Sequence, residues 1–567
     1  MDDDLLDALA RLDARLGELE RRVSALEGSS QPAHSLVVQA ATAAEAAPAT
    51  GQFALPQAGG VFPVVGKAML GIAGAYVLRA VAESGSFPKF AVVTLALAYA
   101  GAWLVWAARV TGGARFASTA YAATSALILA PMLAELTVRF RVVPDSLTAG
   151  LLSLFAILAA ALAWKRNLVP VISVATMAAV FTALALLIVT HDLVPYVAAL
   201  LVVALTSEYA AARDRWPALR FLAAPAVDIA VWIFIYIHSL TESSRPAYAA
   251  VSTSMLLALP SLLFLIYGAG IAWRTNRLHR RITVFEIVQA AVAFLLAALG
   301  WLWFAPNAGR VVLGVFCWLL AAACYTAAFV SFDRVAEQRN YHVYATWSVA
   351  LVLGGSFVML SPLPLALFLS VASVAATLIG VKMARLTPEF HGLVYLAAAA
   401  FASGLLQYAG RALGGTFPSA PGWVVWIVAV AALLCYAMGG RFQEKRWSQQ
   451  LLRLLAAILA VSAVATFLVS CLVWLAAIGM TVGASHVAVI RTLITCALAL
   501  VVAFSGSRWQ RTELVWTAFG TLAFVTAKLL FEDLPHGHSG SIAISIFLYA
   551  VALIVMPRVA RTGRRQN

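Results

Sequence analysis

The 567-residue chain lacks the charge of a soluble protein. Only 11% of its residues are charged, whereas 63% are hydrophobic and the mean hydropathy is +0.90. A typical soluble domain is about half apolar and about a quarter charged. This composition excludes a water-soluble fold and predicts a protein embedded in a membrane.

Cysteine motifs and long polar loops are missing as well. The five cysteines lie inside apolar runs, without CxxC or Cys/His ligand spacing, so we expect helix-packing residues rather than disulfides or metal ligands. We therefore predict no metal and no other cofactor. The loops between apolar runs are too short to hold a soluble catalytic domain, so any chemistry must occur within or at the edge of the helix bundle. We favour a protein that is not an enzyme, and an embedded enzyme is the open alternative.

The positive net charge does not indicate a nucleic-acid partner. The formal charge of +14 arises from Lys and Arg residues that are scattered between apolar runs. A nucleic-acid binder gathers such residues on one solvated module. We interpret the charge as a signal of membrane topology and expect membrane lipids, not nucleic acid, as surroundings.

The N-terminal segment has a heptad pattern. Residues 1–28 form a predicted coiled-coil segment, whose apolar residues are spaced alternately by four and three. Self-association through residues 2–27, or pairing with another coiled coil, is the favoured interpretation. A single amphipathic helix lying on the membrane is the alternative. The predicted seam consists of Leu5, Leu9, Leu12, Leu16, Leu19, Val23 and Leu26.

The rest of the chain divides into three parts. Residues 29–60 are rich in Ala, Ser, Pro and Gln and are predicted to be a flexible linker. Residues 61–558 contain about eighteen apolar runs long enough to cross a hydrocarbon core of about 30 Å. Residues 559–567 form a basic tail. The predicted fold is an all-α, polytopic transmembrane helix bundle with a short N-terminal cytoplasmic coiled coil.

Basic residues alternate along the loops. Loops after even-numbered spans, together with the tail, carry about 25 Lys and Arg residues, whereas the other loops carry about 7, counting Arg411 and Arg491 among the latter. By the positive-inside rule both termini are expected in the cytoplasm. We expect a bacterial inner membrane as the location.

Two end motifs resemble a known family. The first predicted span reads GKAMLGIAGAYVLRAVAESG, and the last loop reads AKLLFEDLPHGHSG. With the heptad segment and the many hairpins, they resemble the bacterial multi-pass membrane proteins of the DUF2339 family, whose function is not established. The K-x-x-x-x-D-L element matches at Lys528, Asp533 and Leu534, whereas Ala543 stands where the family pattern suggests arginine. The resemblance implies an architecture, not an activity.

Several charged residues fall near the predicted outer ends of spans. Lys528 and Glu532 are four residues apart, which predicts that they share one helix face. One interpretation is that Lys528 extends outward to Glu532 at the lipid headgroups. Another is a polar pocket for a lipid headgroup, sugar or ion, and a third is a metal site on the two C-terminal histidines. The candidate pocket residues are Lys528, Glu532, Asp533, His536, His538, Arg79, Glu135 and His238.

Acidic residues also occur near the predicted inner ends. Asp228 lies deepest, in APAVDIAVWIF, and Glu208 and Glu286 lie in or near other spans. An ion pair with a basic residue such as Arg220 is the favoured interpretation for Asp228. A proton relay is the alternative.

Three functions follow from these patterns. The large number of spans with polar groups at membrane depth favours a transporter or flippase-like protein for a lipid-linked, glycan or small amphipathic substrate. The heptad segment favours a non-enzymatic scaffold that organises the cell envelope. A membrane-embedded glycosyltransferase is disfavoured, because the first outer loop offers Glu83 as its single acidic residue.

Overall fold

The structure is a computed structural model built from helices. It describes residues 58–84, 89–110, 115–332, 338–439, 447–479, 481–536 and 538–562, and no strand occurs in these ranges. The all-α prediction is confirmed. The coiled-coil seam from Leu5 to Leu26 and most of the predicted linker lie outside the described residues.

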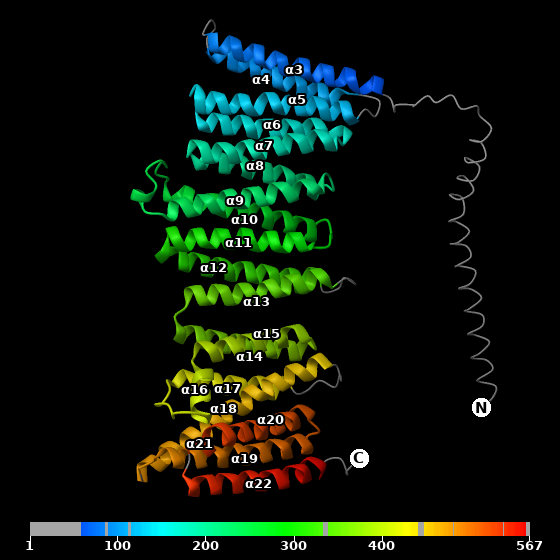
Figure 1. The fold of residues 1–567 in the computed structure, drawn as a ribbon. Coiled ribbons are helices and arrows are strands. Elements are labelled where there is room, and N and C mark those ends of the chain that lie inside the picture. The colour runs from blue at the N-terminus through cyan, green and yellow to red at the C-terminus, as the bar shows by residue number, and fades with distance from the viewer. Residues whose placement is uncertain are drawn as a thin grey trace, which may run out of the picture. The chain divides into compact units, whose positions relative to one another are not determined.

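Contacts divide the chain into two units, Met1–Gly71 and Ile72–Asn567. Within Ile72–Asn567, most helices lie beside helices near them in the sequence, and the colours in Figure 1 run broadly in order from α4 to α22. The main contacts join helices no more than three places apart in chain order. Each hairpin of this unit therefore packs mainly on its neighbours along the chain.

The first half of the described chain holds long helices joined by short turns. Their bounds are α3 (Ala58–Ser84), α4 (Lys89–Arg109), α5 (Arg115–Ala134), η1 (Glu135–Arg139), α6 (Asp145–Arg166), α7 (Val169–Thr190), α8 (Leu193–Ala212), η2 (Pro217–Leu219), α9 (Arg220–Ser239), η3 (Glu242–Ser244), α10 (Thr253–Asn276), α11 (Val284–Phe304) and α12 (Pro306–Thr326).

The second half continues this pattern. Its elements are η4 (Ala327–Phe332), α13 (Arg339–Met359), α14 (Pro362–Met383), α15 (Leu386–Ala402), α16 (Leu405–Leu413), α17 (Trp423–Met438), α18 (Trp447–Gly479), α19 (Ala484–Arg508), α20 (Thr512–Lys528), η6 (Leu529–Asp533), α21 (Leu534–His536) and α22 (Ser539–Thr562). Of the short elements, η1, η4 and η6 are π-helical.

The helices have the length and composition of membrane spans. Within the described residues, 15 helices are long and apolar enough to cross a membrane, and a bent pair formed by α15 and α16 raises the number to 16. Two shorter apolar helices, Val93–Arg109 and Trp423–Met438, lie where the sequence predicts two further spans. The chain is thus an integral membrane protein with many spans.

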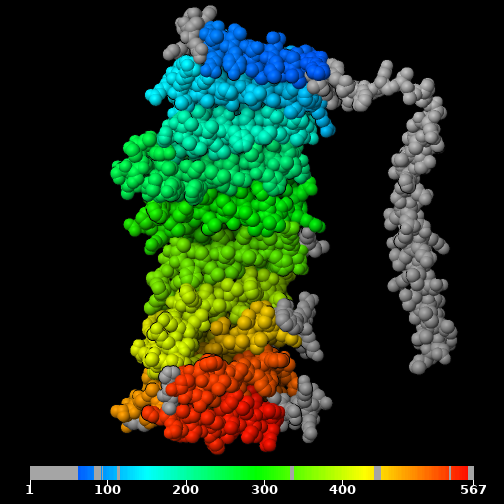
Figure 2. Space-filling view, viewed as in Figure 1, coloured from blue at the N-terminus to red at the C-terminus, as the bar shows by residue number. Residues whose placement is uncertain are grey.

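Small residues allow neighbouring helices to approach closely. A Cβ atom on Gly355 of α13 would lie 2.7 Å from the Cβ of Cys317 and 2.9 Å from the carbonyl oxygen of Gly314, both on α12. Such contacts between small residues are how membrane helices gain packing energy in lipid. Buried apolar clusters continue from α10 to α22, and Figure 2 shows the successive segments in tight contact.

All five cysteines are free thiols within helices. Cys317, Cys324, Cys435 and Cys496 are buried, and Cys471 is half-buried. These positions agree with the prediction that cysteine serves helix packing in this chain.

Candidate functional site

One predicted span is broken near its centre. Helices α15 and α16 meet at an angle of 70° across Ser403 and Gly404. The φ angle of Gly404 is +77°, a left-handed conformation that glycine adopts without strain. The short helix α16 then ends at Leu413, so its last carbonyl groups have no partner within the helix.

A buried arginine from α19 satisfies these carbonyls. The Nε of Arg491 donates to the carbonyl of Ala412 at 2.8 Å, and its two terminal nitrogens donate to the carbonyls of Gly415 and Arg411 at 2.9 Å and 2.7 Å. Only 2% of the Arg491 side chain is exposed. A positive charge at the carboxyl end of α16 also complements the helix dipole.

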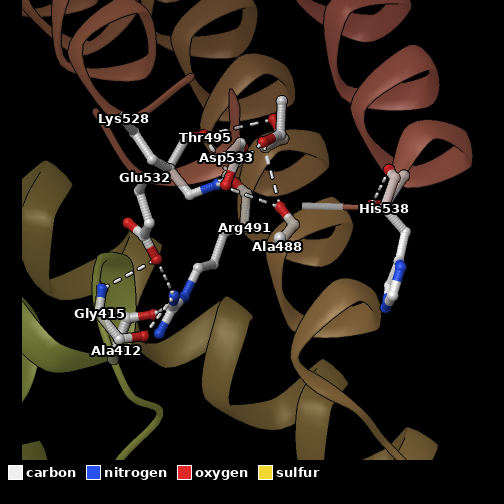
Figure 3. Close-up of polar contacts among 11 residues, drawn as sticks. Ala412, Gly415, Ala488, Arg491, Thr495, Lys528, Glu532, Asp533 and His538 are labelled. Atoms are coloured by element: carbon white, nitrogen blue, oxygen red, sulfur yellow. Dashed lines mark hydrogen bonds and ion pairs between the residues drawn. The ribbon is translucent and has the colours of Figure 1, made fainter. Parts of the chain in front are cut away.

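Glu532 completes this contact. Its Oε1 accepts from Arg491 at 2.9 Å and from the main-chain nitrogen of Gly415 at 2.9 Å. About a third of the Glu532 side chain, 31%, is exposed. The α19 helix, the end of α16 and the π-helical turn η6 are therefore joined by one arginine and one glutamate (Figure 3).

The predicted pairing of Lys528 with Glu532 is wrong. The Lys528 Nζ donates to both carboxylate oxygens of Asp533, at 2.9 Å and 2.7 Å. The lysine is only 5% exposed and also donates at 3.3 Å to the carbonyl of Ala488 and the hydroxyl of Thr492. Lys528 thus lies inside the protein and does not extend outward, and Figure 3 shows its side chain directed to Asp533.

The π-helical turn η6 explains why Lys528 contacts Asp533 and not Glu532. Leu534 donates its main-chain N–H to the carbonyl of Leu529, five residues earlier, instead of four as in an α-helix. This wider turn brings residue i+5, Asp533, to Lys528 and directs Glu532 toward α19. The helical periodicity that predicts an i,i+4 pair does not hold in such a turn.

Two other candidate residues form a separate ion pair. The Nη1 of Arg79 on α3 lies 2.8 Å from Oε1 of Glu135, the first residue of η1. Both side chains border a largely apolar cavity of about 260 Å³ between α3, α4 and α5. In Figure 1 these helices lie at the opposite end of the row from α20, so the eight candidate residues do not form one pocket.

The candidate histidines do not join either ion-pair cluster. His238 is buried in α9, where its Nδ1 lies 2.9 Å from the carbonyl of Phe234. His538 is exposed, and Figure 3 shows its side chain apart from the ion pairs. The side chain of His536 lies outside the described part of the structure. Within that part, no group of three His, Cys, Asp or Glu residues is arranged to hold a metal ion.

A second buried cluster lies between α8, α9, α10 and α11. The Nε of Arg220 donates to Glu208 at 2.5 Å, and its Nη2 donates to Glu286 at 3.1 Å. Arg274 forms an ion pair with Glu286 as well. The predicted pairing of Arg220 with Asp228 is therefore wrong, since the guanidinium lies between two glutamates on neighbouring helices.

Sequence reasoning missed Arg491 as a member of the site. The sequence SHVAVIRTLITC places this arginine within an apolar run, and we assigned it to the preceding loop. The signal that identifies it is its depth, since it is the eighth residue of α19 and lies about 10 Å along the helix axis. A lone arginine at that depth needs a partner.

Comparisons of the chain with protein-family models, with curated proteins and with solved structures found no match. The resemblance to the DUF2339 family therefore stays a prediction from the two end motifs and the layout of the chain.

Proposed function

We propose that this protein is a non-enzymatic transporter or flippase-like protein of the bacterial inner membrane that moves an anionic amphipathic substrate, such as a lipid-linked molecule. The observation that carries this proposal is the broken span α15–α16, whose end is held by the buried side chain of Arg491. Helices interrupted within the membrane, with exposed main-chain groups at the break, are common at transporter binding sites.

The contacts at the carboxyl end of α16 can be exchanged. Arg491 and Lys528 carry two positive charges, and Glu532 and Asp533 carry two negative charges, so the cluster is neutral when all four are ionised. Glu532 is the partly exposed member. An incoming phosphate or carboxylate can take the place of Glu532 on the guanidinium, which is suited to bind either group through two hydrogen bonds. Release of Glu532 would free the main-chain nitrogen of Gly415 as a second donor.

The cavity at the other end of the row supports an amphipathic substrate. Its walls are mainly side chains such as Val93, Leu127 and Met132, and the ion pair of Arg79 and Glu135 lies at its border. An apolar chain would fit against the walls, and a polar headgroup would lie near the charges. The two sites share this combination of apolar surroundings and a paired arginine.

Reconstitution tests the proposal. Purified protein in liposomes is supplied with fluorescent anionic phospholipids or polyprenyl phosphates, and their movement between leaflets is followed by quenching. We expect wild type to accelerate movement and Arg491→Lys to reduce the rate about tenfold, a loss of about 1.4 kcal/mol. Arg508→Lys is the matched control, because Arg508 is exposed on the same helix. No acceleration by wild type over protein-free liposomes would contradict the proposal.

A scaffold is the second candidate, favoured by the serial packing of the helices. Because each hairpin contacts mainly its neighbours, the row presents long lipid-facing surfaces that could hold copies or partners. The predicted coiled coil of residues 2–27 would assemble them. Deleting residues 1–30 separates the two candidates: a transporter keeps its lipid movement, whereas a scaffold loses its oligomeric state, measured by light scattering in detergent.

A further inference from the structure

The cluster between α8 and α11 contains more acids than bases. Glu208 and Glu286 are 3% and 2% exposed, and their charges are balanced by the guanidinium groups of Arg220 and Arg274. Asp228 is the third acid. Its Oδ1 accepts a hydrogen bond of 2.9 Å from Gln289, a neutral partner on α11. With every group ionised, the cluster has one excess negative charge.

Asp228 lies deep within its span. It is eight residues after Arg220, the first residue of α9, and therefore about 12 Å along the helix. Its side chain is half-buried between neighbouring helices. Ionised carboxylates at such depth are costly and are normally paired with a cation. Both cations of the cluster already contact glutamates, so the carboxyl of Asp228 is the group on which the excess charge falls.

Two buried polar atoms of the cluster lack partners. Neither Oε2 of Glu208 nor the hydroxyl of Tyr267 has a hydrogen-bond partner among the described residues, and Tyr267 is 1% exposed. The phenol lies close enough to Glu208, Asp228 and Arg220 to interact with their charges. Buried polar groups without partners are rare, and they point to a proton or water that belongs at the site.

Gly270 allows Oε2 of Glu208 to lie close to α10. A Cβ atom at Gly270 would lie 3.2 Å from Oε2 of Glu208, so the absence of a side chain lets the carboxylate approach the helix. Gly270 is one turn after Tyr267 on the same helix. The two unsatisfied groups thus belong to one polar region, which extends from α8 across α10 toward α9.

We propose that the cluster between α8 and α11 is a proton-binding site, in which the carboxyl group of Asp228 binds and releases a single proton. Binding converts the carboxylate to a carboxylic acid and changes the net charge of the cluster from minus one to zero. The acid keeps one oxygen as the acceptor for Gln289 and gains a hydroxyl that can donate a hydrogen bond. This site does not depend on the transport function proposed above.

The titratable and charged groups on the helices that pack around Asp228 support this assignment. Helix α8 presents Glu208, α10 presents Tyr267 and Arg274, and α11 presents Glu286 and Gln289, while Arg220 lies on α9 itself. Helix α7 also packs on α9, and its sequence contains no titratable residue. Since the glutamates are held by arginines and the remaining neighbours of Asp228 are neutral, its carboxyl is the one that exchanges a proton most readily.

Infrared spectroscopy of the purified full-length protein tests the site. A protonated carboxylic acid has a carbonyl stretch that ionised carboxylates lack. We expect this band in wild type at mildly acidic pH, where exposed carboxylates are still ionised, its loss at alkaline pH, and a clearly reduced band in Asp228→Asn under the same mildly acidic conditions. Asp214→Asn is the control and should keep the band, because Asp214 is exposed and paired with Arg280. A wild-type spectrum without the band, or a band of undiminished intensity in Asp228→Asn, would overturn the proposal.

A second measurement distinguishes a proton from a metal cation and does not require the infrared band. The melting temperature of wild type should fall as pH rises, because deprotonation leaves an unbalanced charge in the membrane, and Asp228→Asn should show a smaller fall. Asparagine has nearly the same shape as aspartate, so folding should persist. Adding sodium at constant pH should change neither protein. Stabilisation of wild type by sodium, absent from Asp228→Asn, would show a cation site instead.

Discussion

Replacing Arg491 with methionine should destabilise the fold more than a typical substitution does. Methionine fills a similar volume but removes the donors to the carbonyls of Arg411, Ala412 and Gly415 and the cation that contacts Glu532. The carboxyl end of α16 then has unsatisfied carbonyls, of which that of Ala412 is buried. Glu532 keeps its contact with the main-chain nitrogen of Gly415.

The magnitude follows from burial. Removing one partner of a buried ion pair costs about 3 to 5 kcal/mol, since it leaves the other charge without compensation. Here Arg491 is almost fully enclosed, whereas water reaches part of Glu532. Partial hydration of Glu532 reduces the cost, and the buried carbonyl of Ala412, left unsatisfied, adds about 1 to 3 kcal/mol, whereas the carbonyls of Arg411 and Gly415 are only partly buried. We expect a loss of about 3 to 5 kcal/mol.

The assay is reversible unfolding in mixed detergent and lipid micelles, followed by tryptophan fluorescence. Wild type is compared with Arg491→Met, Glu532→Gln and the double variant, which form a thermodynamic cycle. The double variant should be less destabilised than the sum of the single variants, because no uncompensated charge remains. Arg508→Met, at an exposed position, should change stability by about 0.5 kcal/mol or less. An Arg491→Met variant as stable as this control would refute the reasoning.

Three further outcomes are expected. Lys528→Met should lower the free energy of unfolding by about 3 to 5 kcal/mol in the same assay, because it leaves the buried carboxylate of Asp533 without its cation. A loss below about 1 kcal/mol would show that the lysine is in water. Gly355→Ala should cost about 1 to 3 kcal/mol by forcing α12 and α13 apart, whereas Gly354→Ala, with open space around it, should be neutral or stabilising; equal effects would contradict the packing. Burial and, secondarily, the Asp145 carboxylate raise the pKa of Asp192 above its ordinary 3.8, so this group favours the folded state only while protonated. The melting temperature of wild type should therefore fall as pH rises above about 3.8. The Asp192→Asn variant should melt at a higher temperature than wild type at pH 7, and its melting temperature should fall less with pH. Identical melting curves for the two proteins would exclude the effect.

The positions of the spans could be predicted because each is a local property of the chain. About twenty apolar residues in a row form a helix in lipid whatever surrounds them, since every main-chain group must find its hydrogen bond within the segment. The broken span α15–α16 shows the limit. Its composition is that of one continuous helix. The 70° bend at Gly404 depends on how the helices pack, and this cannot be predicted from composition.

The members of the candidate site could be predicted only in part. Lys528, Glu532 and Asp533 attract notice because charges are rare in an apolar run. Their pairing could not be inferred, because it depends on the π-helical turn at Leu529–Asp533 and on Arg491, a residue 37 positions before Lys528. No periodicity connects such residues.

By itself the sequence determined that this is an α-helical membrane protein, where its spans lie and which charges are exceptional, because the cost of placing polar groups in lipid acts on each segment separately. The tertiary structure decided which charges meet. Arg220 pairs with Glu208 and Glu286 and leaves Asp228 to Gln289, and Arg491 satisfies the end of α16. Ion pairing depends on distances between side chains of different helices, and those distances are set by how the helices pack.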